Sequence, residues 1–195
     1  MTIVIIHGTY GNHQGNWFPW LAAQLRLLGH VVEIPQFPTP KKQSLKSWKN
    51  VFNRQFKTVQ PDMVLVGHSL GAGFILNLLE QSSHPVLATF FVCGFIGKIG
   101  LAAFDVLNES FVCREFDWDK IRRNMGKAHL LGSDNDPYVS LAKLEELANK
   151  LQIPFTLIAG GEHLNTESGY TEFPLLLEQM QNTLEDKSVI INRDY

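Results

Sequence analysis

Cysteine is scarce in this chain, with only Cys93 and Cys113 among 195 residues, and the two form no C-x-x-C pair. A chain of this length buries enough apolar surface to fold without disulfides. We therefore expect both thiols to be reduced and the protein to be cytoplasmic. The histidines show no H-E-x-x-H spacing, so the sequence predicts neither a metal site nor a cofactor.

A surplus of basic charge is also missing. Lysine and arginine number 17 and aspartate and glutamate 19, which gives a formal net charge of −2. Nucleic acids and anionic lipids are bound through an excess of basic side chains. The charge balance therefore predicts no nucleic-acid partner, and nothing in the sequence identifies a protein partner.

Long uninterrupted apolar runs are absent as well. The residues from Val86 to Phe104 are apolar apart from Lys98, but a central lysine costs about 2.5–3.5 kcal/mol in a membrane and glycines weaken the helix. We expect a buried strand at Val86–Cys93 followed by an apolar loop or short helix, with no membrane span. The first residues, Met1–His7, lack the basic region of a secretory signal.

Short apolar runs alternate with segments of helical spacing along the whole chain. Near-continuous apolar runs are typical of parallel strands covered on both faces. The predicted strands are Ile3–Ile6, His30–Ile34, Met63–Val66, Val86–Cys93, Ala128–Leu131 and Phe155–Ile158. The predicted helices are Trp17–Leu28, Ser44–Phe56, Leu70–Glu80, Ser140–Leu151 with Ser140 as N-cap, and Pro174–Leu184. This alternation predicts one α/β domain over residues 1–195, built on a doubly wound, mostly parallel sheet of about six strands.

A G-x-S-x-G pentapeptide, Gly67-His68-Ser69-Leu70-Gly71, joins the third predicted strand to the following helix. A serine on such a strand-to-helix turn is held in a strained conformation with its hydroxyl exposed. The N-terminus of the helix supplies free N–H groups to an oxyanion. Ser69 is therefore the candidate nucleophile, and a simple glycine-rich turn with Ser69 as helix cap is the alternative.

A second glycine-containing turn, His7-Gly8-Thr9-Tyr10-Gly11, directly follows the first predicted strand. In hydrolases with a serine elbow, a loop at this place supplies one oxyanion donor and the residue after the serine supplies the other. The predicted donors are the amides of Leu70 and Thr9, with Tyr10 as the alternative to Thr9. His7 and Tyr10 are also candidates for substrate contact, although His7 and Gly8 equally suit an ordinary turn.

The acid and the base are expected after the nucleophile, in the order serine, acid, histidine. Asp134 and Asp136 both follow the strand Ala128–Leu131. Asp136 precedes a proline and the next helix, which should turn it inward, whereas Asp134 and its neighbour Asn135 are typical of Asx turns. Asp136 is the preferred acid. His163 follows the last predicted strand and is the only histidine after Asp136, so it is the candidate base.

These segments resemble the small serine hydrolases related to retinoblastoma-binding protein 9 and the bacterial YdeN proteins. The similarity lies in the first loop with Trp17 and Trp20, Gly67–Ala72, Phe116–Ile121, Gly132–Tyr138 and Gly161–Asn165. The resemblance implies an α/β-hydrolase fold without a large cap domain, and Ser69, Asp136 and His163 as a catalytic triad. The first loop departs from the family, with His7-Gly8 where the human relative has proline-glycine. The L-x-C-x-E motif that binds pocket proteins is absent, so no such partner is implied.

The residues and the resemblance together predict a serine hydrolase that acts on a small carboxylic ester through an acyl-enzyme, with thioesters and amides as possible subtypes. There are two alternatives. One is an acyltransferase with the same triad, and the other is a binding protein that keeps the fold without turnover. The unusually apolar segment Phe95–Phe111 is a candidate lid or wall of the substrate site, with Phe95 and Ile96 as predicted contacts. Packing over the sheet edge is its other explanation.

Overall fold

A computed structural model describes residues 1–185, so the last part of the predicted domain, residues 186–195, lies outside the described residues. All neighbouring strands of its six-stranded sheet pair in parallel, in the order β2-β1-β3-β4-β5-β6. The strands are β1 (Thr2–Ile6), β2 (Val31–Glu33), β3 (Met63–His68), β4 (Ala88–Val92), β5 (Lys127–Ser133) and β6 (Phe155–Ile158). The prediction of about six parallel strands is confirmed, and each predicted run overlaps one strand, although β1, β3 and β5 extend beyond the predicted bounds.

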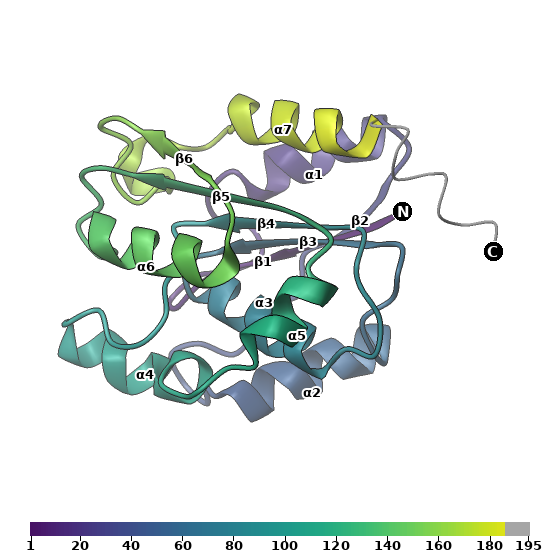
Figure 1. The fold of residues 1–195 in the computed structure, drawn as a ribbon. Helices are drawn as coiled ribbons and strands as arrows, with labels where there is room; N and C mark the ends of the chain where they lie inside the picture. Colours follow the sequence, from purple (N-terminus) through teal and green to yellow (C-terminus); the bar gives the residue numbers. More distant parts are fainter. Residues whose placement is uncertain (186–195) are drawn as a thin grey trace.

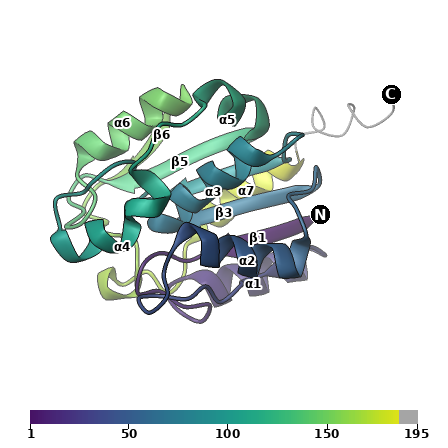
Figure 2. The same cartoon turned by 90° about the horizontal axis from the view of Figure 1, so that it is seen from below.

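Helices cover both faces of this sheet (Figures 1 and 2). One face carries α1 (Phe18–Leu27) and α7 (Pro174–Glu185), and the other carries α2 (Leu45–Phe56), α3 (Leu70–Gln81), α4 (Ala102–Val112), α5 (Trp118–Asn124) and α6 (Leu141–Leu151). Side chains alternate across a strand, so Ile3 and Ile5 of β1 join the core under α1 and α7, whereas Val4 and Ile6 join the other core. The doubly wound architecture is thereby confirmed.

Two helices differ from the expectation. The apolar loop or short helix expected after β4 contains α4, an 11-residue helix, and α5 was not predicted. The carboxylate of Asp105 accepts the N–H groups of Ile99 (2.8 Å) and Gly100 (3.1 Å), which folds the preceding loop onto the first turn of α4. The side chain of Asp117 caps α5 by accepting the N–H of Lys120.

The expected cap of α6 is also corrected. Ser140 stands at the N-cap position, but its side chain makes no capping hydrogen bond, and its main-chain carbonyl receives the N–H groups of Lys143 and Leu144 instead. In contrast, Ser44 before α2 forms a reciprocal capping box with Ser47. No helix within residues 1–185 is long and apolar enough to cross a membrane.

The parallel sheet places the carboxyl ends of β1, β3, β5 and β6 at one edge. In open α/β sheets this edge is where ligands bind, because loops from several strands converge there. A short 3₁₀ helix, η1 (Thr166–Ser168), follows β6 on the same side of the molecule. The predicted nucleophile, acid, base and first-loop donor all lie on these four strand-end loops, whereas the predicted contacts Phe95 and Ile96 follow β4.

Candidate active site

Ser69 forms the single-residue turn between β3 and α3, with φ 56° and ψ −122°. A positive φ strains any residue other than glycine, and such strain is typical of functional turns. Gly67 and Gly71 must be glycine because main-chain atoms approach them too closely to leave room for a side chain. A Cβ on Gly67 would lie 2.6 Å from the carbonyl carbon of Gly71, and one on Gly71 would lie 2.3 Å from the carbonyl oxygen of Ile6. The turn therefore packs directly against β3 and β1.

Next to Ser69, the loop after β6 carries the imidazole of His163 and the loop after β5 carries the carboxylate of Asp136. Nδ1–H of His163 donates to Oδ2 of Asp136 at 2.7 Å, and both side chains are buried. The other carboxylate oxygen accepts the N–H groups of Tyr138 (2.8 Å) and Val139 (3.0 Å). Burial alone would raise the pKa of Asp136, but its bond to His163 and these amide donors outweigh that and hold the pKa below its usual value. The carboxylate is therefore ionised.

Asp134 and Asn135 hold the histidine loop in place and do not contact the imidazole. Oδ1 of Asp134 accepts the N–H of Gly160, and Oδ1 of Asn135 accepts the N–H of Glu162, each at 2.8 Å. The expectation that Asp134 and Asn135 form local Asx turns is corrected, since Asp136 makes that turn. Between the two aspartates, only Asp136 reaches the histidine.

His68, inside the pentapeptide, is a contact that the sequence did not predict. Its Nε2–H donates to the main-chain carbonyl of His163 at 2.9 Å, so the turn that carries Ser69 also grips the loop that carries the imidazole. Burial is the largest cause and repulsion from His163 the next largest, and they lower the pKa of His68 to about 3. The ring is therefore neutral at ordinary pH.

Three potential metal ligands lie together at the pocket, which two of them, His68 and His163, line. His68, Cys93 and His163 each offer one ligand atom, and these atoms lie within 4.8 Å of one another. Their hydrogen bonds already engage one nitrogen of each ring, and Cys93 bonds to Asp136. A metal needs the thiolate, but burial and the charge of Asp136 raise the pKa of Cys93 well above its usual value. We therefore interpret the cluster as support for the imidazole and carboxylate.

The first loop lies directly against the serine, since a Cβ on Gly8 would stand 2.8 Å from Cβ of Ser69. The N–H of Tyr10 donates to Oγ1 of Thr39 at 2.8 Å, so this alternative oxyanion donor is occupied. No hydrogen bond within residues 1–185 occupies the N–H of Thr9. Leu70 is the first residue of α3, where an N–H has no acceptor within the helix. The predicted pair of donors, Thr9 and Leu70, thus has free amides.

Of the four residues predicted to contact substrate, Tyr10 and Phe95 line the pocket that contains Ser69, and the other two do not. His7 is buried, where its Nδ1–H donates to the carbonyl of Gly8 and its Nε2 accepts the N–H of Phe37. Ile96 lines a separate cavity, and its carbonyl accepts the ammonium of Lys143. His7 is thus held by main-chain partners in the interior, and Ile96 belongs to the buried core, so neither lines the pocket of Ser69.

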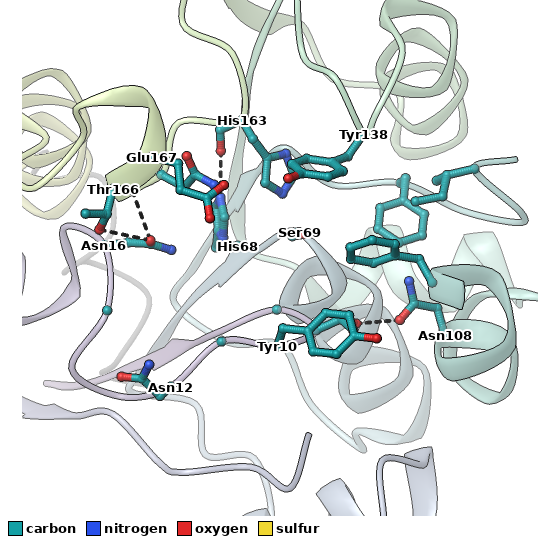
Figure 3. Close-up of a pocket in the computed structure, with 18 residues that line it drawn as sticks. Tyr10, Asn12, Asn16, His68, Ser69, Asn108, Tyr138, His163, Thr166 and Glu167 are labelled. Atoms are coloured by element: carbon teal, nitrogen blue, oxygen red, sulfur yellow. Dashed lines mark hydrogen bonds between the residues drawn. The ribbon is translucent and has the colours of Figure 1, made fainter. Parts of the chain in front are cut away.

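The pocket around Ser69 and His163 has a volume of about 370 Å³ and two unlike walls (Figure 3). The aromatic wall consists of Tyr10, Phe95, Ile99, Phe104 and Tyr138. The polar wall consists of Asn12, Asn16, Asn165, Thr166 and Glu167. The ring of Phe104 contacts those of Tyr10 and Tyr138, with centroids 5.4 and 5.5 Å apart, and Tyr138 in turn contacts His163 at 4.9 Å.

Most of these wall residues were not predicted. Phe104 falls inside the apolar segment expected to be a lid or wall, and Tyr138 lies two residues after Asp136, so proximity to a known feature was a usable signal. Asn165, two residues after His163, carried the same signal, whereas Asn12 and Asn16 lie on an irregular loop away from the predicted triad.

Hydrogen bonds connect the first loop to α4 through Gln43. Its Nε2 donates to Oγ1 of Thr9 (3.1 Å), to Oδ1 of Asn108 (3.0 Å) and to the carbonyl of Leu107 (3.0 Å). Its Oε1 accepts the hydroxyl of Thr39 at 2.6 Å, and the hydroxyl of Thr9 donates to Asn108. We call these four side chains the Gln43 network. It fixes the loop of the candidate oxyanion donor to the helix that carries Phe104.

Comparisons with known proteins identify the family and the fold. YdeN of Bacillus subtilis is 28% identical over 178 residues, which cover 90% of this chain and 92% of the relative. The crystal structure of YdeN superposes on this chain with a TM-score of 0.87, covering 95% of this chain and 99% of YdeN. The rat serine hydrolase RBBP9 is 22% identical over 184 residues, which cover 93% of this chain and 94% of the relative. Mouse alpha/beta hydrolase domain-containing protein 10 shares the fold, with a TM-score of 0.69 at 15% identity over 94% and 89% of the chains. The Serine hydrolase family matches residues 3–182. The chain therefore belongs to the serine hydrolase family and has the α/β-hydrolase fold without a large cap domain.

Proposed function

We propose that this protein hydrolyses small carboxylic esters, with Ser69 as nucleophile, His163 as general base and Asp136 as the group that orients the base. The observation that carries the proposal is the buried 2.7 Å hydrogen bond between His163 and Asp136 beside the pocket that Ser69 lines. An ionised carboxylate on Nδ1 fixes the tautomer that leaves Nε2 free to accept a proton. The serine on its strained turn supplies the hydroxyl.

The reaction follows from these roles. Nε2 of His163 takes the hydroxyl proton as Oγ of Ser69 forms a bond to the ester carbon, and the carbonyl oxygen becomes an oxyanion. The N–H groups of Leu70 and Thr9 stabilise that charge, each contributing on the order of 10²–10³ in rate. His163 then protonates the departing alcohol. Water repeats the sequence on the acyl-enzyme, which releases the carboxylic acid and restores Ser69.

The buried charges around the imidazole suit this cycle. The carboxylate of Asp136 stabilises the positive imidazolium that forms when the proton is transferred. His68 stays neutral because burial lowers its pKa to about 3, so it adds no second positive charge beside His163. We also infer a cytoplasmic location, since Cys93 and Cys113 are unpaired.

Labelling with a fluorophosphonate probe tests the nucleophile. We expect the native protein to be labelled at Ser69, as located by peptide mass spectrometry, and Ser69→Ala to be unlabelled and to lose hydrolysis of nitrophenyl esters. Undiminished labelling of Ser69→Ala, or no labelling of the native protein, would contradict the proposal. Product analysis in the presence of an added alcohol separates hydrolysis from transfer, because a transferase would form the new ester in place of the acid.

A further inference from the structure

The polar wall of the pocket presents a specific set of hydrogen-bonding groups. Building on the proposed ester hydrolysis, we propose that the preferred substrate joins an apolar acyl group to an alcohol that carries further hydroxyl groups, such as a glycerol-like or sugar-like alcohol. The acyl group lies against the aromatic wall, and the hydroxyl groups lie against the polar wall.

The first support is the orientation of three side-chain amides. Oδ1 of Asn16 accepts the N–H and the hydroxyl of Thr166 at 3.1 and 3.3 Å. Oδ1 of Asn12 accepts the N–H of Gln14, and Oδ1 of Asn165 accepts the N–H and hydroxyl of Ser168. In each case the oxygen is committed to the protein. Each side chain keeps an NH₂ group with no acceptor within residues 1–185, on a residue that lines the pocket.

The second support is the charge of the pocket. Glu167 is its one acidic lining residue, it is exposed, and its carboxylate has no hydrogen bond or ion pair within residues 1–185. None of the described residues that line the pocket is lysine or arginine. A negatively charged alcohol part would meet Glu167 with no cation to compensate for it. The polar wall therefore suits a neutral group.

A hydroxyl group matches this mixture of donors and acceptor. It accepts from an amide NH₂ through a lone pair and donates its proton to a carboxylate. A cationic group would satisfy Glu167 but would leave the NH₂ groups of Asn12, Asn16 and Asn165 facing another donor. Figure 3 shows Asn16, Thr166 and Glu167 on one side of Ser69 and Tyr10 on the other, so both walls border the reacting centre. An ester bound at Ser69 directs its two substituents toward different walls.

A matched pair of esters tests the assignment. Glycerol 1-monobutyrate and propyl butyrate have the same acyl group and the same three-carbon alcohol, and they differ by two hydroxyl groups. We expect kcat/KM of the native protein to favour the glycerol ester by about tenfold, the size of one or two exposed hydrogen bonds. Butyrylcholine, which carries a cation in place of the hydroxyls, should be a poorer substrate than the glycerol ester.

Asn16→Asp is the sharpest variant because it replaces only the NH₂ group. Aspartate keeps the oxygen that Thr166 needs and tolerates the left-handed φ of 52° at this position. We expect the ratio of kcat/KM for the glycerol ester to kcat/KM for propyl butyrate to fall about three- to tenfold. Asn12→Asp, at an exposed position, is the second variant. Asn149→Asp on the exposed face of α6 is the control and should leave the preference unchanged.

The outcomes separate this inference from the proposed function. Turnover of neither ester, together with absent labelling of Ser69, would contradict the hydrolase itself. Equal turnover of the two esters, a preference for butyrylcholine, or a preference that survives in both Asn16→Asp and Asn12→Asp would overturn the substrate assignment while leaving the ester hydrolase in place.

Discussion

The strand-end side of the pocket consists of the loops that carry Ser69, Asp136 and His163, and the α4 side consists of the helix that carries Phe104 and Asn108. Different kinds of contact hold each side in place. The loops after β5 and β6 are joined by the bond from Gly160 to Asp134, and the end of β3 is joined to the loop after β6 by the bond from His68 to His163, although β4 and β5 lie between those two strands in the sheet. Helix α4 is tied to the first loop by the direct bond from Thr9 to Asn108 and through Gln43, a residue from neither element. The groups proposed to react thus lie at the ends of sheet strands that are bonded to one another, whereas the wall that faces substrate includes a helix outside the sheet that is bonded to the first loop.

The largest test of this difference is Asp136→Asn. The amide oxygen keeps the bonds from Tyr138 and Val139, but the side chain no longer holds the tautomer and charge that His163 needs. We expect kcat for nitrophenyl esters to fall about 10⁴-fold with KM little changed. The measurement is steady-state hydrolysis at neutral pH, with folding checked by circular dichroism.

Asp134→Asn is the matched control for that variant. Its oxygen still accepts the N–H of Gly160, so we expect a loss of no more than about tenfold, because only the hold on the histidine loop is weakened. If Asp134→Asn lost as much activity as Asp136→Asn, the distinction between an orienting acid and a loop anchor would be wrong.

The strand-end side was open to prediction because its signals are local. Ser69 is followed by a helix and preceded by a buried strand, and His163 and Asp136 follow apolar runs directly, so sequence position alone brings them to one edge of a parallel sheet. The grip of His68 on the histidine loop was missed, since that bond joins residues 95 positions apart. Periodicity carries no information about such a contact.

A smaller test concerns the bond from His68. The folded protein keeps this imidazole neutral down to about pH 3, whereas the unfolded chain binds a proton near pH 6.5. The unfolded state therefore takes up the extra proton, and the free energy of unfolding decreases as the pH falls through this window. At pH 5 the loss from His68 is roughly 2 kcal/mol.

His68→Gln removes this titration and keeps an N–H donor near the carbonyl of His163. We expect the decrease in unfolding free energy between pH 7 and pH 5 to be smaller than in the native protein by roughly 2 kcal/mol, as measured by urea denaturation. The pKa values of His7 and His129 are also lowered by burial, and their contributions remain in both proteins. Parallel pH dependences would show that His68 is not the buried neutral group.

The α4 side was harder to predict for a physical reason. Its helix exposes Val106 almost completely (76%) while burying the polar Asn108, so apolar spacing gives a misleading pattern. Asn108 is buried because Thr9 and Gln43 donate to it. The asparagines of the polar wall are fixed by turns and by a bond between Asn16 and Thr166, 150 positions apart. Loops that owe their conformation to distant partners leave no periodic signal.

The smallest expected effect decides what the Gln43 network does. Gln43→Met keeps the length of the side chain but removes three donated hydrogen bonds, which leaves the direct bond from Thr9 to Asn108 as the remaining hydrogen bond between the first loop and α4 within residues 1–185. If the network positions the amide of Thr9, kcat should fall about tenfold at nearly constant KM, because an oxyanion donor acts on the transition state. Gln55→Met, whose side chain bonds only to Glu33 among residues 1–185, is the control. A rise in KM at constant kcat would instead assign the network to the aromatic wall, and the two sides of the pocket would then be independent.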